Sequence, residues 1–215
     1  MDGVIDATAM VRSGDAALSR LLAAEPGRVV GLVGPAGFGL TRLGLSMLAH
    51  PAAAGQVAVI DVRGWMSPEA AWEVGVAPER LVVVRCSDRL LWPKVVAALV
   101  EGIPAIYAEV PAGIDDSTLR RLGALTRSRR AALLLRPLRG GLPSGLAHLH
   151  LDARKVAWSG VEQGHGRLSR RRLFLLARGR ATRGIEQTVE VEDDGTHAVR
   201  VVSGLAVAPA GRAAG

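Results

Sequence analysis

The stretch Gly34-Pro35-Ala36-Gly37-Phe38-Gly39-Leu40-Thr41 decides the fold of this chain. Its glycines have the spacing of a phosphate-binding loop, whose backbone N–H groups surround phosphate oxygens, but Leu40 stands where such loops carry a lysine. The apolar run 29–33 before it predicts a buried strand, and residues 41–52 after it predict a helix. The structural context of the motif is therefore present, while the cation that would bind the β- and γ-phosphates of a nucleotide is missing.

Length and composition predict one domain with a sizeable core, because the chain has 215 residues and 49% of them are hydrophobic. No apolar run reaches the ~18–20 residues of a membrane span, and the N-terminus, with Asp2 and Asp6, lacks a signal-peptide pattern. We therefore expect a cytoplasmic protein without membrane contact. Cys86 is the only cysteine, which excludes an internal disulfide and a cysteine-based metal site, and we expect it to be buried.

The net charge of +7 is unevenly distributed along the chain. Residues 118–183 contain 15 arginines and one lysine but only two acids, Asp152 and Glu162, and so carry +14, while the remainder carries −7. Such a segregated charge predicts contact with a polyanion or with an acidic protein. A compositional bias toward arginine over lysine is the alternative explanation, but it does not account for the loss of acids from this part of the chain.

Further apolar runs predict a parallel sheet covered by helices. Strands and helical patterns alternate over about 100 residues after the glycine loop, and the strands are near-continuous apolar runs, as strands buried on both faces are. The predicted strands are 57–61, 81–85, 105–109 and 131–135, Pro51 is expected to end the first helix, and later helices are expected to begin at Ser67, near Trp92 and at Ser117.

The pattern changes after the Gly/Pro-rich segment 139–145. Four extended segments follow at 148–157, 173–180, 186–192 and 197–202, and Asp193-Asp194-Gly195 is a hairpin signal between the last two. The predicted fold class is thus α/β, with a mostly parallel sheet flanked by helices and a C-terminal antiparallel extension. We expect an N-terminal helical segment over 1–26, the core over 27–203 and a flexible tail over 204–215.

From about Gly27 to Val202, the order of elements and several local strings resemble the RecA-type ATPase core. The strings are Gly27-Arg28-Val29-Val30, Val59-Ile60-Asp61, Ala70-Ala71-Trp72, Val74-Gly75-Val76 and Leu149-His150-Leu151-Asp152-Ala153-Arg154-Lys155. None is specific alone, but their common order and spacing support a degenerate RecA-like core.

Departures from the RecA pattern fall on the positions that the resemblance makes catalytic. Leu40 replaces the phosphate-binding lysine, and Arg63 stands where the family has the glutamate that activates water; an arginine cannot accept a proton. Glu109 aligns with the aspartate that helps to hold magnesium, and Arg136-Pro137 aligns with the polar pair that senses the γ-phosphate. We therefore predict a pseudo-ATPase with no catalytic residues, cofactor or metal, whose degenerate nucleotide loop comprises Gly34, Gly37, Gly39, Leu40, Thr41, Arg63 and Glu109.

A short, catalytically degenerate RecA relative with an arginine-rich C-terminal half is similar to the ImuA family, and more narrowly to its actinobacterial ImuA-prime or SulA-like type. The resemblance implies an accessory protein of the SOS response to DNA damage, which acts in mutagenic translesion DNA synthesis. It would be an adaptor for an ImuB-type Y-family-like protein and, through it, for an error-prone polymerase and the sliding clamp, with nucleoid association and self-association as further expectations.

Six arginines are the candidates for sequence-independent contact with DNA or an acidic partner. Four of them are expected in a Gly/Ser-containing turn with little acid nearby, although a solvated surface is an alternative interpretation of such charges. Two rival functions stay open: a SulA-like cell-division inhibitor, and a DNA-dependent ATPase that uses unconventional residues. The six candidates are Arg136, Arg139, Arg167, Arg170, Arg171 and Arg172.

Overall fold

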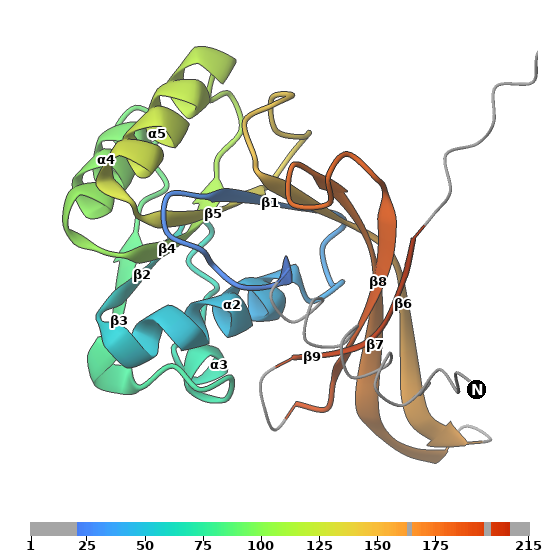
Figure 1. Cartoon of the computed structure of the whole chain (residues 1–215). Coiled ribbons are helices and arrows are strands. Elements are labelled where there is room, and N and C mark those ends of the chain that lie inside the picture. Colours follow the sequence, from blue (N-terminus) through green and yellow to red (C-terminus); the bar gives the residue numbers. More distant parts are fainter. Residues whose placement is uncertain (1–20, 163–164, 196–198, 207–215) are drawn as a thin grey trace, which may run out of the picture.

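The computed structural model describes residues 21–162, 165–195 and 199–206. Its elements follow the predicted alternation, which changes to an all-strand second part (Figure 1). The helices are α2 (Leu40–Ala54), α3 (Glu69–Trp72), α4 (Trp92–Gly102) and α5 (Asp116–Arg129), and a 3-10 turn covers Pro78–Arg80. The strands are β1 (Val29–Val33), β2 (Val57–Asp61), β3 (Leu81–Arg85), β4 (Ala105–Val110), β5 (Ala132–Pro137), β6 (Leu149–Glu162), β7 (His165–Gly179), β8 (Gln187–Asp193) and β9 (Arg200–Ala206).

Within the described residues the strands form one sheet, in the order β3-β2-β4-β5-β1-β6-β7-β8-β9. The pairs from β3 to β6 are parallel, and those from β6 to β9 are antiparallel. The predicted fold class is therefore confirmed. Because β1 is central and parallel to its neighbours β5 and β6, the glycine loop leaves the carboxyl end of the sheet beside the ends of β4 and β5.

Two hydrophobic cores cover the two faces of the parallel part. Helices α2 and α3 lie on one face, and α4 and α5 lie on the other (Figure 1). Side chains alternate between the faces along each strand. On β5, for example, Leu134 packs in the core on the α2 side and Leu133 packs in the core on the α4 side. The same alternation directs Tyr107, Glu109 and Arg136 toward the α2 face, where the glycine loop ends.

Several elements differ from their predicted extents. Helix α2 continues through Pro51 to Ala54; the proline lies in the last turn, where it removes a single helical hydrogen bond, and Gly55 N still donates to its carbonyl at 3.1 Å. Strand β7 begins at His165, so the turn predicted for the arginines near 170 is wrong, and β6 extends to Glu162. Of the N-terminal helical segment predicted over 1–26, residues 1–20 lie outside the described residues, and 22–26 form turns and irregular backbone instead of a helix. Strand β9 reaches Ala206 and so includes the first residues of the tail predicted over 204–215, the rest of which lies outside the described residues.

Candidate functional site

The glycine loop holds Leu40 in the core instead of presenting a cation at its mouth. The Leu40 side chain is 1% exposed and belongs to the core on the α2 face. Its Cδ1 lies 3.1 Å from the place that a Cβ on Gly34 would take, and the Cβ of Ala153 on β6 lies 2.7 Å from the same place. Leu40 therefore fills the space beneath the loop, and its burial contributes to folding rather than to phosphate binding.

Arg171 on β7 lies directly over Gly39 of the loop. A Cβ at Gly39 would come within 2.5 Å of both terminal guanidinium nitrogens of Arg171, and the backbone φ of Gly39 is 81°. The guanidinium also pairs with Asp193 and lies 5.4 Å from the ring centroid of Trp158. The loop therefore has an arginine of the antiparallel extension against it, a proximity that no local sequence pattern predicts.

Arg42, the residue after Thr41, is engaged in ion pairs. Its Nε donates to Asp193 at 2.9 Å, and its Nη1 donates to Glu73 at 2.5 Å. Asp193 thus accepts from an arginine of α2 and from Arg171 of β7. This ion-pair cluster of Arg42, Asp193, Arg171 and Glu73 fastens the antiparallel extension to the helix that follows the glycine loop.

The carboxylate of Glu109, the candidate magnesium ligand, accepts hydrogen bonds from other groups of the chain. Its carboxylate accepts four hydrogen bonds: from the backbone N–H of Val62 at 3.1 Å, from that of Arg63 at 3.2 Å, and from Arg63 Nε at 2.9 Å and Nη2. The hydrogen bond with Glu109 raises the pKa of Arg63 above its ordinary value. The two positions to which the RecA resemblance assigns a metal ligand and a base therefore form an ion pair with each other.

Two further polar groups near the loop also have partners within the chain. Both carboxylate oxygens of Asp61, at the end of β2, accept backbone N–H bonds of the turn at Gly64–Met66. The Tyr107 hydroxyl donates to Thr41 Oγ1 at 3.4 Å, and burial raises the pKa of Tyr107 to about 12, so the phenol is neutral. Thr41 keeps the hydroxyl that binds magnesium in working loops, but here the hydroxyl accepts from a buried tyrosine.

Arg136 and Arg139 lie in very different surroundings. Arg136 is 6% exposed, and its Nε and Nη1 atoms are buried with no hydrogen-bond partner among the described residues. Its side chain therefore offers almost no surface to DNA, contrary to its place among the candidate contacts. Arg139 is exposed on the segment that joins β5 to β6, where it remains a candidate contact.

The cluster predicted as a basic turn is part of β7 and has acids beside it. Arg171 and Arg172 are cross-strand partners of Asp193 and Glu192 on β8. Arg172 lies 3.3 Å from Glu192 and 3.9 Å from Glu190, so the expectation of little nearby acid is wrong. Arg170 is exposed, and the backbone of Arg167 belongs to the same strand. Acidic residues that are remote in sequence neutralise two of the four arginines.

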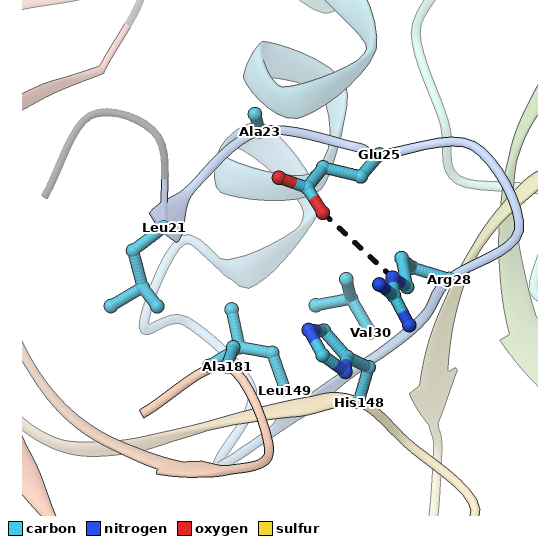
Figure 2. A pocket seen from close by; sticks show the side chains of 8 residues that line it. All are labelled: Leu21, Ala23, Glu25, Arg28, Val30, His148, Leu149 and Ala181. Carbon is cyan, nitrogen blue, oxygen red and sulfur yellow. Dashed lines mark ion pairs between the residues drawn. The ribbon is translucent and has the colours of Figure 1, made fainter. Parts of the chain in front are cut away.

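A pocket of about 190 Å³ lies at the opposite, amino-terminal end of β1 (Figure 2). Arg28 and Glu25 pair across its rim at 3.8 Å, with His148 beside Arg28 (Figure 2). Burial, together with the charges of Arg28 and Arg180, lowers the pKa of His148. The imidazole is therefore neutral near pH 7, and Glu25, the carboxylate of the pocket, is paired with Arg28.

These features define a RecA-like fold: a central parallel sheet, a glycine loop that leads into α2, and an antiparallel continuation. The chain belongs to the family described as the MT3502 N-terminal domain, whose model matches residues 22–140. The crystal structure of the RadB recombinase is similar at a TM-score of 0.60 and 16% identity, covering 87% of this chain and 97% of that chain, which supports the fold alone. No curated protein matches the chain. No helix within the described residues is long and apolar enough to cross a membrane.

Proposed function

We propose that this chain is a RecA-like accessory protein that does not hydrolyse ATP and acts as an adaptor in DNA-damage-induced mutagenic translesion synthesis. The observation that carries the proposal is the ion pair between Arg63 and Glu109. It places the guanidinium of Arg63 on the carboxylate that a magnesium ion would need, at the position where an active enzyme has its general base.

The expected loss of activity is large. A charge-assisted hydrogen bond contributes ~1.5–3 kcal/mol, so replacing the loop lysine with Leu40 costs roughly tenfold to a hundredfold in nucleotide affinity. The missing general base costs a further factor of about 10²–10⁴ in rate. A metal that bound Glu109 would also have to displace Arg63, which would leave a partly buried guanidinium without its partner.

The adaptor role rests on the resemblance to the ImuA-prime type and on an exposed apolar surface. Trp65 after β2 is 77% exposed, and Leu90 and Leu91 after β3 are 76% and 49% exposed. These residues follow the carboxyl ends of two neighbouring parallel strands. Exposed large apolar side chains are typical of a protein-binding surface. We assign this Trp65–Leu91 surface to an ImuB-type Y-family-like partner, which in turn would bring the error-prone polymerase and the sliding clamp.

Two experiments test the proposal. ATP turnover is measured with and without DNA, and we expect no turnover above that of a Thr41→Ala variant; turnover that Thr41→Ala abolishes would refute the pseudo-enzyme.

Capture is measured separately with purified partners. We expect an ImuB-type protein to bind the parent chain and to bind a Trp65→Ser/Leu90→Ser variant at least tenfold more weakly. Equal capture of both chains would exclude this surface, and binding to a tubulin-like division protein alone would favour the division-inhibitor role.

A second candidate function, a DNA-dependent ATPase with unconventional residues, is favoured by the position of Arg171. This guanidinium lies against Gly39, where it would supply a cation to a bound phosphate. Its ion pair with Asp193 would have to open for that purpose. The turnover measurement decides between the two functions, and an Arg171→Ala variant that lost a measurable turnover would establish the second.

A further inference from the structure

A second and larger cavity, of about 620 Å³, lies on the sheet face opposite α2. It is bounded by the segment that joins β5 to β6, by the first residues of β6 and by the connection from β7 to β8. Leu142 and His150 lie together over β1, since a Cβ on Gly31 would contact both. We call this cavity the arginine pocket and define it by its polar lining residues, Ser144, His150, Arg178, Arg180 and Arg183.

The lining of the arginine pocket carries three guanidinium groups and no carboxylate. Arg178 pairs with Asp152 at 2.9 Å, but Asp152 also has Arg154 at 3.6 Å. Arg180 and Arg183 are exposed, and neither side chain has a hydrogen bond or ion pair within the part of the chain that the structure describes. Uncompensated positive charge is therefore concentrated here, whereas the arginines near Gly39 are largely neutralised.

The connection that carries these arginines is held in a defined shape. Thr182 Oγ1 donates to the carbonyl of Gly179 at 3.0 Å, and the N–H of Gly184 donates to the same carbonyl at 3.0 Å. Arg183 has a φ of 54°, in the left-handed region that residues other than glycine seldom adopt. Backbone strain of this kind persists where the surrounding structure fixes it. The turn presents Arg180 and Arg183, neither of which has a side-chain partner among the described residues.

The chemistry of the pocket selects a phosphate group. Guanidinium groups bind phosphate oxygens through paired N–H donors, and Ser144 adds a hydroxyl donor. Burial and Arg178 lower the pKa of His150, so its neutral ring offers one N–H without adding charge. The lining includes no phenylalanine, tyrosine or tryptophan, so bases have no such ring to stack on. Exposed Arg139 on the adjoining segment and Arg154 on β6 extend the positive surface, as a linear polyanion requires.

We propose that the arginine pocket binds backbone phosphates of a nucleic-acid strand independently of sequence. The inference deepens the DNA contact expected for the proposed adaptor. It rests on that function only for the choice of nucleic acid over a free phosphate compound. Its test requires neither ATP nor a partner protein, so its failure would leave the adaptor role to the turnover and capture experiments.

The test measures binding of the full chain to short labelled single-stranded and duplex DNA of two unrelated sequences, by fluorescence anisotropy over a range of salt concentrations. The variant is Arg180→Gln/Arg183→Asn, in which asparagine tolerates the left-handed backbone. We expect at least tenfold weaker binding for every sequence. The slope of log affinity against log salt should fall by about 0.7–0.9 for each phosphate that the variant no longer neutralises. A control, Arg120→Ala/Arg127→Ala on α5, removes the same charge from an exposed helix and should bind as the parent does.

Four outcomes overturn the proposal. The first is unchanged affinity and salt slope in the variant, provided that its unfolding transition matches that of the parent. The second is an equal fall in affinity for the α5 control, which would mean that net charge alone acts. The third is displacement of DNA by pyrophosphate that supplies the same concentration of phosphate groups as the DNA, which would assign the pocket to a small phosphate compound. Equal displacement by polyglutamate would assign it to an acidic protein segment.

Discussion

The guanidinium of Arg63 and the carboxylate of Glu109 bind each other between the carboxyl ends of β2 and β4, at the positions that the resemblance to RecA-type enzymes assigns to a base and a metal ligand. Glu109 is almost fully buried and Arg63 is about a quarter exposed, so the pair is only partly screened by solvent. Each residue alone looks like a missing catalytic group. Together they form one hydrogen-bonded unit, in which the carboxylate also accepts the backbone N–H groups of Val62 and Arg63.

Breaking this pair should destabilise the fold strongly. Arg63→Met leaves the buried carboxylate of Glu109 with two backbone donors, and we expect the free energy of unfolding to fall by about 3 kcal/mol, the lower end for a broken buried pair, because Arg63 is partly exposed. Urea unfolding of Arg63→Met, Glu109→Leu and the double variant forms a double-mutant cycle. The double variant should be destabilised by less than the sum of the two single effects; additive effects would show that the two residues do not couple.

The position of Leu40 leads to a second prediction, since the side chain faces the core instead of the loop. Leu40→Lys should lower the free energy of unfolding by about 2–4 kcal/mol, because it replaces buried apolar area with an ammonium group that is costly to bury. It should also leave ATP turnover at background. Leu40→Met, which keeps the volume, is the control and should cost less than about 1.5 kcal/mol. A well-folded Leu40→Lys chain that hydrolyses ATP would contradict both expectations.

Two loop glycines separate backbone strain from the contact with Arg171. Gly37 and Gly39 have φ values of 83° and 81°, but a Cβ on Gly37 would meet nothing within 4 Å. Gly37→Ala should therefore cost about 1–2 kcal/mol from the backbone alone. Gly39→Ala should cost at least ~1 kcal/mol more, because the methyl group displaces the guanidinium. Thermal and urea unfolding measure both, and adding Arg171→Ala should remove the difference; a difference that persists would place the cause elsewhere.

A feature of this structure can be predicted from the sequence when it is visible within a single segment. A feature that exists only after two strands have paired cannot be predicted in this way. Strands such as β2 and β5 are continuous apolar runs, so their place in a parallel sheet follows directly. The substitutions at Leu40 and Arg63 can also be recognised as single positions. Strand β7 cannot be recognised from its own sequence, because Arg170–Arg172 has the composition of a polar turn. Its strand character becomes clear only from its pairing with β8. The pairs of Arg171 with Asp193 and of Arg172 with Glu192 exist only in that register.

Histidines at the start of β6 predict a dependence of stability on pH. Burial, with nearby arginines, lowers the folded-state pKa of His148 and His150 below the ordinary value near 6.5. Below that pH the unfolded chain takes up protons before the folded chain does, so stability should fall between about pH 6.5 and the lower folded values. The thermal midpoint of a His148→Gln/His150→Gln variant should fall less between pH 7.5 and pH 5.5 than that of the parent. Identical falls would show that other groups titrate.

The last prediction concerns Arg136. Like Arg63 it is an arginine near Glu109, but we expect that it does not stabilise the fold as Arg63 does. It is the in-register neighbour of Glu109 on β5, but the carboxylate of Glu109 is taken up by Arg63, and two guanidinium nitrogens of Arg136 have no partner among the described residues. Burying an unpaired charge costs free energy, which an apolar side chain of similar length does not require. Arg136→Met should therefore leave the free energy of unfolding unchanged or raise it, while Arg63→Met, the same chemical change two strands away, lowers it. Urea unfolding of both variants under one set of conditions makes the comparison. A destabilisation of about 2 kcal/mol or more in Arg136→Met would mean that an enclosed water or anion satisfies the guanidinium.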